Sequence, residues 1–185
     1  MTPLYQGGVF TAICVSENCQ IFDGSLKNMN PDYQPAQPDF EIRIRDRFKR
    51  QQVMQLLSAR LVKVLPGEVH IELPFHPKIT QQHGYVHAGI ITTILDSACG
   101  YAAFSLMPAD SSVLSVEFKM NFLYPAEGET FIGIGKVVKS GRTLTVCSGE
   151  LQSVSQEKNL VVAIMQATMI AVSGKPQNIT ELHNF

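Results

Sequence analysis

One acidic residue, Asp96, stands in the middle of a segment that otherwise consists of apolar, small and hydroxyl-bearing residues. The apolar residues between positions 90 and 103 recur at the spacing of an α-helix, which predicts a buried helix. A carboxylate in such a place is unfavourable unless it is paired or performs chemistry. The residues alone leave a structural and a catalytic role for Asp96 equally open.

The turn "HAG", residues 87–89, comes directly before this helix. Backbone N–H groups at a helix N-terminus lack partners within the helix and lie at the positive end of its dipole. Such donors can bind a developing oxyanion, so together with a carboxylate they favour acyl-transfer chemistry. We interpret His87 as a residue that orients the turn rather than as an acid or base, and His83 as a loop residue. Cys99 has no base at helical spacing, and we interpret it as a small core residue rather than a nucleophile.

The surrounding elements must position these groups. Residues 41–59 have the composition of a helix, and residues 68–75 alternate apolar with polar side chains, as a half-buried strand does. Four long strands follow the Asp96 helix, at residues 113–125, 130–140, 143–155 and 159–172, with short connections. Such an order predicts one antiparallel sheet with a central helix against it, which is an α+β fold. Gly133 and Gly135 predict a close approach of another backbone or a helix to their strand.

The two ends of the chain differ in composition from this domain, and one segment within it is strongly basic. Residues 1–40 are rich in Pro, Asn, Asp and Gly and predict an irregular extension in which Met29 is a second candidate start; residues 173–185 form a tail. Five basic residues lie between Arg43 and Arg50. They could form a patch for an anionic ligand, but we favour a solvated helix face.

Composition narrows the classes of function. The chain has 185 residues and a formal net charge of −1, which gives no electrostatic reason to expect a nucleic-acid partner. We see no signal peptide or membrane-spanning segment, so we expect a cytoplasmic protein without a membrane partner. The four cysteines are too scattered for a disulfide framework. Cys14 and Cys19 have no second Cys or His pair nearby, so we expect no metal.

The sequence resembles the hotdog-fold acyl-CoA thioesterases of the PaaI-like (phenylacetate-pathway) family. That family has a His-Gly-Gly turn, an apolar helix and an Asp nine residues after the His; His87, Ala88, Gly89 and Asp96 correspond, with Ala88 in place of the first glycine. A Ser/Thr-Val-Asp/Glu strand that ends in proline, a Gly-Arg hairpin and a late strand follow, matched by "SVEFKMNFLYP" (115–125), "KSGRTL" (139–144) and "LVVAIMQATMIAV" (160–172). The resemblance spans residues 41–172 and implies a hotdog fold, a long antiparallel β-sheet wrapped around a central α-helix.

The resemblance also implies roles for single residues. Asp96 would attack the thioester carbonyl or activate water for that attack. The backbone N–H of Ala88, with that of Gly89, would bind the thioester oxygen. Gln81 stands where the family has an Asn or Gln that helps to hold the water, and Ser115 stands where a strand hydroxyl from the facing subunit supports the reaction.

The expected substrate is an acyl-CoA, with no further cofactor. Two segments correspond to those that meet CoA in the family: Phe122, Leu123, Tyr124 and Pro125, and Lys139, Ser140, Gly141, Arg142, Thr143 and Leu144. The same fold also serves enoyl-CoA hydratases and dehydratases, and His87 with Asp96 is compatible with that chemistry. A non-catalytic acyl-CoA-binding protein is the third alternative. The sequence does not specify the acyl chain.

We expect a homodimer at least, and a tetramer built from two dimers. Asp96 and Ala88 are eight residues apart, which is roughly 12 Å along a helix axis at 1.5 Å per residue. One carboxylate therefore cannot reach a carbonyl bound at the N-terminus of its own helix. Antiparallel helices in a two-fold dimer would bring Asp96 of one subunit to the Ala88 turn of the other.

Overall fold

The structure is a computed structural model that describes residues 33–154 and 159–173. Its elements in chain order are α1 (Phe40–Arg50), α2 (Gln52–Leu56), β1 (Arg60–Leu65), β2 (Glu68–Pro74), the 3-10 turn η1 (Pro77–Ile79), α3 (Ala88–Phe104), β3 (Ser111–Phe122), β4 (Thr130–Ser140), β5 (Leu144–Val154) and β6 (Leu160–Ser173). The predicted helices, the strand after Pro66–Gly67 and the four long strands are confirmed.

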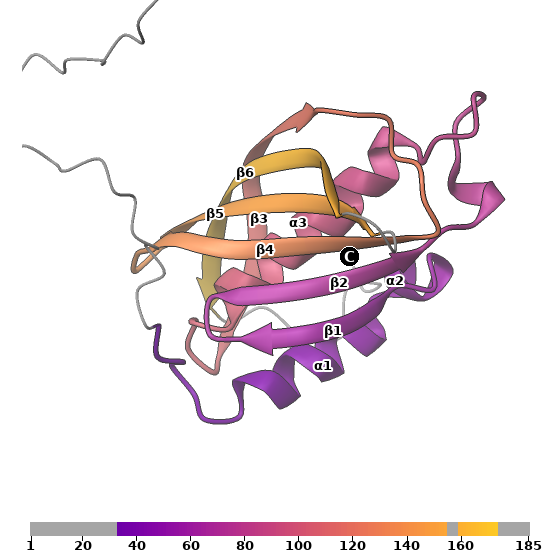
Figure 1. The fold of residues 1–185 in the computed structure, drawn as a ribbon. Helices are drawn as coiled ribbons and strands as arrows, with labels where there is room; N and C mark the ends of the chain where they lie inside the picture. Colours follow the sequence, from indigo (N-terminus) through magenta and orange to yellow (C-terminus); the bar gives the residue numbers. More distant parts are fainter. Residues whose placement is uncertain (1–32, 155–158, 174–185) are drawn as a thin grey trace, which may run out of the picture.

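All six strands belong to one antiparallel sheet with the order β1-β2-β4-β5-β6-β3. The sheet curves around α3, which lies along its concave face, as Figure 1 shows. Between β2, which is next to the edge strand β1, and β3, which forms the opposite edge, the chain crosses the sheet, and α3 lies in that crossover. This is the predicted α+β hotdog fold.

Helix α3 lies at backbone contact distance from β4. A Cβ atom added to Gly135 would lie 2.3 Å from the carbonyl carbon of Ala98, and one added to Gly133 would lie 2.5 Å from Cγ2 of Ile94. Both distances are far below van der Waals contact, so only glycine fits at these positions. The predicted close approach of a helix to this strand is confirmed.

Helix α1 packs against the C-terminal half of α3. The rings of Phe48 and Tyr101 have centroids 5.9 Å apart, and the guanidinium groups of Arg43 and Arg47 lie 4.7 Å and 4.2 Å from the centre of the Phe104 ring. The helix breaks at Gln51, whose extended backbone (φ −80°, ψ 99°) separates α1 from α2. This break turns the Gln51 side chain towards α3, where it contacts Ser97 and Tyr101.

One strand and one charge cluster differ from the sequence-based interpretation. Strand β1 was not predicted, because only Val64 among its residues is buried and its register shifts between Leu61 and Lys63. Glu68 at the start of β2 is buried, although its place in the alternation predicts an exposed side chain. His70, which is also on the polar side of the alternation, is half-buried and bonds to the Glu68 carboxylate at 2.7 Å.

The charge cluster holds Glu68 ionised. Its carboxylate accepts hydrogen bonds from Lys63 (2.8 Å) and His70, and Lys136 lies 3.6 Å away. Burial alone would raise the pKa of Glu68, but the two hydrogen bonds and the charge of Lys136 together hold it below its usual value. The cluster therefore explains how β2 accepts a buried acid.

The predicted extension lies mostly outside the described residues. Residues 33–39 are irregular, as predicted, but Tyr33 is not part of a loose tail: its hydroxyl donates to the Val138 carbonyl at 3.3 Å and its ring lies against Gly67. The interpretation of residues 1–32 and 174–185 falls outside the described residues. Among the described helices none is long and apolar enough to cross a membrane. A cytoplasmic location stays a prediction.

The packing of α3 on β4 and β5 predicts that alanine in place of two sheet glycines lowers stability to different extents. Gly135→Ala should destabilise the fold by about 3 kcal/mol or more, because its Cβ meets rigid backbone. Gly149→Ala should lower stability by only about 1 kcal/mol, because its Cβ would lie 3.0 Å from Cys99 Sγ, a side-chain atom with some freedom to move. Urea unfolding followed by circular dichroism measures both. Equal stability of the two variants would contradict the close contact.

Candidate active site

Asp96 is held by a hydroxyl from the neighbouring strand of the same chain, so the expectation that Ser115 acts from the facing subunit does not fit this geometry. The Oγ of Ser115 on β3 donates to Oδ1 of Asp96 at 2.6 Å. A β-bulge follows Ser115 directly, since its partner on β6 is Met169 while Glu117 already pairs with Thr168. A bulge re-aims the side chains beside it, so it accounts for the direction of Ser115. No hydrogen bond among the described residues reaches Oδ2 of Asp96, which leaves that oxygen available.

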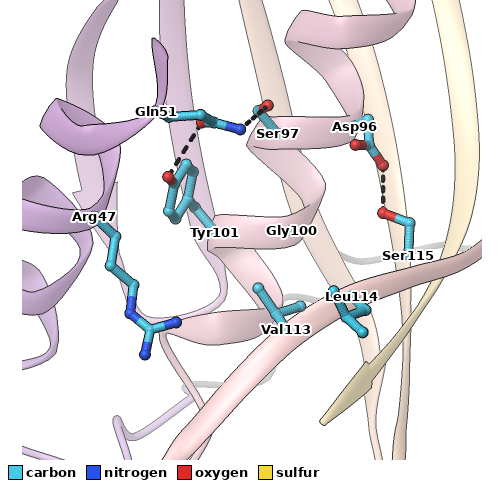
Figure 2. A pocket seen from close by; sticks show the side chains of 9 residues that line it. All are labelled: Arg47, Gln51, Asp96, Ser97, Gly100, Tyr101, Val113, Leu114 and Ser115. Atoms are coloured by element: carbon cyan, nitrogen blue, oxygen red, sulfur yellow. Dashed lines mark hydrogen bonds between the residues drawn. The ribbon is translucent and has the colours of Figure 1, made fainter. Parts of the chain in front are cut away.

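A cavity of about 210 Å³ lies beside Asp96, between α1, α3 and β3. Figure 2 shows Asp96 and Ser115 on one side of it and Gln51, Tyr101 and Arg47 on the other. The complete lining is Arg47, Gln51, Asp96, Ser97, Gly100, Tyr101, Val113, Leu114 and Ser115. The cavity gives the carboxylate access to a small molecule.

The turn before α3 has one satisfied and one unused donor. Nδ1 of His87 accepts the N–H of Gly89 at 2.9 Å, so His87 is the N-cap of the helix. This agrees with its interpretation as the residue that orients the turn. The Gly89 donor is therefore engaged, and the resemblance-based expectation that it joins the oxyanion site does not fit this geometry. The N–H of Ala88 has no partner among the described residues and remains available.

A second cavity, of about 370 Å³, lies over the Ala88 turn. It brings together Gln81, Ala88 and the strand end, with Phe122, Leu123, Tyr124 and Pro125 in its wall. The N–H of Val86 donates to the Ala126 carbonyl at 3.2 Å and fixes the turn to that strand end. Oε1 of Gln81 accepts the backbone N–H of the exposed His83, and the described contacts leave the Gln81 amide N–H groups unused.

The predicted site residues therefore fall into two groups. Asp96 and Ser115 line one cavity, whereas Gln81, Ala88 and the Phe122–Pro125 segment line the other. The hairpin Lys139–Leu144 lines neither. It follows the end of β4 at Ser140, whereas the turn before Ala88 is bonded through Val86 to Ala126, shortly before β4 begins. The hairpin and the turn therefore lie at opposite ends of β4. A single chain does not bring the predicted residues into one place.

Three residues that line the cavity beside Asp96 were not predicted from the sequence. Arg47 and Gln51 come from the first helix and its end, and Tyr101 lies more than one turn after Asp96 on α3. The run of basic residues was the available signal, and the preference for a solvated face holds only for part of it. Lys49 and Arg50 are exposed, but Arg47 is half-buried and lines the cavity.

The buried cysteines are unreactive by environment. Cys99 and Cys147 are both fully buried. Burial raises the pKa of Cys99 well above its usual value and that of Cys147 to about 12, so neither is a thiolate near neutral pH. This agrees with the interpretation of Cys99 as a core residue. Among the described residues no group of three His, Cys, Asp or Glu side chains is placed to hold a metal, and Cys14 and Cys19 lie outside them.

The part of the chain that contains these site residues is similar to known thioesterases. The family model "Thioesterase superfamily" matches residues 83–159. A crystal structure of a thioesterase family protein from Silicibacter pomeroyi is 50% identical, covers 73% of this chain and 99% of that chain, and superimposes with a TM-score of 0.72. A curated protein of Saccharolobus solfataricus named "Putative esterase" is 31% identical over 104 residues, which are 56% of this chain and 74% of the relative.

The PaaI protein from the phenylacetic acid degradation operon of E. coli has the same fold. Its structure is 17% identical in sequence, covers 74% of this chain and 96% of that chain, and has a TM-score of 0.66. At this identity the likeness concerns the fold alone. Together with the closer similarities it confirms the resemblance that the motifs indicate.

The buried thiols predict selective resistance to alkylation. In the native protein at about pH 8, iodoacetamide should leave Cys99 and Cys147 unmodified, because alkylation needs an accessible thiolate. Both should react after unfolding in urea. Peptide mass spectrometry reports each cysteine separately, and the unfolded sample is the control. Rapid labelling of native Cys99 would show that α3 does not bury this thiol.

Proposed function

This chain belongs to the thioesterase superfamily and is a thioester hydrolase, and we propose that it hydrolyses acyl-CoA to a free acid and CoA at a site shared by two subunits. Asp96 acts as the nucleophile or the general base. The backbone N–H of Ala88 from the second subunit binds the thioester oxygen. The observation that carries the proposal is the Asp96 carboxylate, fixed by Ser115 at 2.6 Å beside an open cavity.

The hydrogen bond from Ser115 suits a reactive carboxylate. The donor to Oδ1 fixes the plane of the carboxylate and leaves Oδ2 facing the cavity side of the group. Oδ2 can then attack the carbonyl carbon or take a proton from a water molecule that does so. In the first route CoA leaves as the thiol, the acyl group is held on Asp96 as a mixed anhydride, and water then hydrolyses this anhydride and regenerates the carboxylate. In the second route water itself attacks the carbonyl carbon, and its proton goes through Asp96 to the leaving thiol. In both routes the C–S bond breaks and the products are the free acid and CoA.

The Ala88 N–H supplies the complementary donor. It lies at the start of a helix of 17 residues, where the helix dipole favours the negative charge that develops on the thioester oxygen. Gln81 lines the same cavity, and in this proposal its side-chain amide holds the attacking water. The apolar wall formed by the strand end suits the pantetheine arm of CoA.

Neither half of the site works alone. Asp96 and Ala88 are about 12 Å apart along the axis of α3, at a rise of 1.5 Å per residue. A two-fold dimer with antiparallel α3 helices places Asp96 of each subunit at the Ala88 turn of the other. Each dimer then holds two complete sites.

Strand β3 supports such a dimer. It forms one edge of the sheet over 12 residues, so its outer backbone groups have no partner strand among the described residues. Four of its apolar side chains, each between 44% and 54% exposed, would be covered by a second copy: Leu114, Val116, Phe118 and Phe122. Three further apolar side chains are exposed: Val62 and Leu65 on β1, and Val138 on β4. They offer a surface for contact between two dimers, so the proposal includes a tetramer.

Substitutions at the Asp96–Ser115 pair test the chemistry. Asp96→Asn should lower the release of free thiol from acyl-CoA at least about 1,000-fold, because it removes the reacting carboxylate. Ser115→Ala should lower it about 10- to 100-fold, the effect of one charge-assisted hydrogen bond. Ser112→Ala, three positions earlier on β3 and outside the cavity, is the matched control and should keep wild-type turnover.

The assay uses a panel of acyl-CoAs and a thiol-reactive dye. A hydratase would release no thiol, because the thioester survives hydration. Size-exclusion chromatography confirms that the variants keep the oligomer. Activity of Asp96→Asn within a few-fold of the wild type would contradict the assignment of Asp96.

A further inference from the structure

The cavity beside Asp96 has a polar wall that the hydrolytic chemistry does not require. Asp96 and Ser115 lie at one side, and the side chains of Arg47, Gln51 and Tyr101 lie at the other (Figure 2). Since Asp96 contacts the thioester carbonyl in the proposed function, an acyl group that points away from CoA reaches this wall. The wall therefore bears on which acyl group is accepted.

Arg47 is the charged group of this wall. Its guanidinium stacks 4.2 Å from the centre of the Phe104 ring and donates one hydrogen bond, to the Ser111 carbonyl at 3.1 Å. No carboxylate within the described residues forms an ion pair with it, whereas the neighbouring Arg45 pairs with Glu41 at 2.7 Å. A guanidinium has five N–H donors and stays protonated in proteins, so Arg47 retains donors and charge for an anion.

The electrostatic surroundings of Arg47 favour an anionic partner. Partial burial lowers the pKa of Arg47, and the positive charges of Arg43 and Arg50 lower it further. An anion bound at Arg47 would offset the repulsion from Arg43 and Arg50. Burial also raises the pKa of the Tyr101 hydroxyl to about 12, so this group is neutral and does not repel an anion.

Gln51 and Tyr101 hold the wall in a fixed shape. The Tyr101 hydroxyl donates to Oε1 of Gln51 at 3.1 Å, and Nε2 of Gln51 donates to the Ser97 hydroxyl at 3.4 Å. These bonds engage the polar atoms of the Gln51 amide, except one N–H. Arg47 is thus the principal unsatisfied donor of the wall.

The size and the remaining walls restrict the acyl chain. The cavity volume is about 210 Å³. A protein cavity of about 150 Å³ holds one benzene molecule, so this one accommodates a short chain or a single ring. Val113 and Leu114 supply an apolar side for methylene groups, and Gly100, one helical turn after Asp96, leaves the passage open.

We propose that the preferred substrates are CoA thioesters of short dicarboxylic acids, whose terminal carboxylate pairs with Arg47 while the thioester carbonyl lies at Asp96. This inference rests on the proposed function, because it uses Asp96 to place the carbonyl. It assigns Arg47 as a specificity-determining residue. The phosphates of CoA lie at the far end of the cofactor moiety from the thioester, so they are not the anion that Arg47 binds.

A pair of substrates of equal shape tests the proposal. Glutaryl-CoA ends in a carboxylate, and in 5-methylhexanoyl-CoA an isopropyl group replaces that carboxylate. The wild-type enzyme should hydrolyse glutaryl-CoA with a kcat/KM at least about tenfold higher, which corresponds to one charge-assisted pair. Arg47→Met should abolish this preference or reverse it, and Arg47→Lys should retain part of it.

Arg43→Met is the matched control. Arg43 also stacks on Phe104, at 4.7 Å, but bonds to the carbonyls of Pro108 and Ala109 and does not line the cavity. The Arg43→Met variant should leave the ratio of kcat/KM for the two substrates unchanged. The ratio of the two kcat/KM values does not change when part of a variant fails to fold, because both substrates are hydrolysed by the same folded molecules.

Two results would overturn the inference. One is a wild-type enzyme that does not prefer glutaryl-CoA. The other is a preference that survives in Arg47→Met, as it does when the variant loses the same fraction of kcat/KM for both substrates. Calorimetric titration of both thioesters into Asp96→Asn measures the same discrimination without turnover. If the enzyme hydrolyses no acyl-CoA at all, the proposed function is refuted. The ratio of the two dissociation constants from calorimetry then still tests the role of Arg47.

Discussion

The backbone contact between α3 and β4 is the constraint on which the rest of the structure depends. Gly135 lets the helix approach until a single Cβ atom would overlap the Ala98 backbone. At that separation α3 can neither shift nor rotate without a clash, because the interior is close-packed. The helix carries Ala88 at its first residue and Asp96 two turns later. Fixing the helix therefore fixes both chemical groups and the distance between them.

That fixed distance divides the chemistry between two places. One cavity holds Asp96 with Ser115, and the other holds the Ala88 donor with Gln81. A rigid helix cannot bring its own first turn to its own middle. The exposed apolar edge strand β3, which also carries Ser115, offers the surface through which a second copy could complete each half. Catalysis and assembly would then follow from one geometric restriction.

Periodic features could be predicted from the sequence and non-local ones could not. Strong alternation predicted the four long strands, and helical spacing predicted α3 with Asp96 inside it. Strand β1 was missed because an edge strand with one buried residue carries little periodic signal. The approach of Arg47 to Asp96 depends on how α1 packs against α3, which no local pattern encodes. Likewise the Ser115 contact depends on a bulge in β3, and the cap that occupies the Gly89 N–H depends on the rotamer of His87.

The central claim is that each site combines Asp96 of one subunit with the Ala88 donor of another, and mixed dimers test it most directly. Ala88→Pro deletes the donor N–H at the first helical position, where proline is tolerated, and His87 already has the extended backbone (φ −61°, ψ 137°) that must precede proline. Asp96→Asn disables the other half. Each variant alone should be inactive. After equal amounts are unfolded and refolded together, half of the dimers are mixed and each has one intact site, so about a quarter of wild-type activity should return. Mixed dimers that form but stay as inactive as their parents would contradict the shared site.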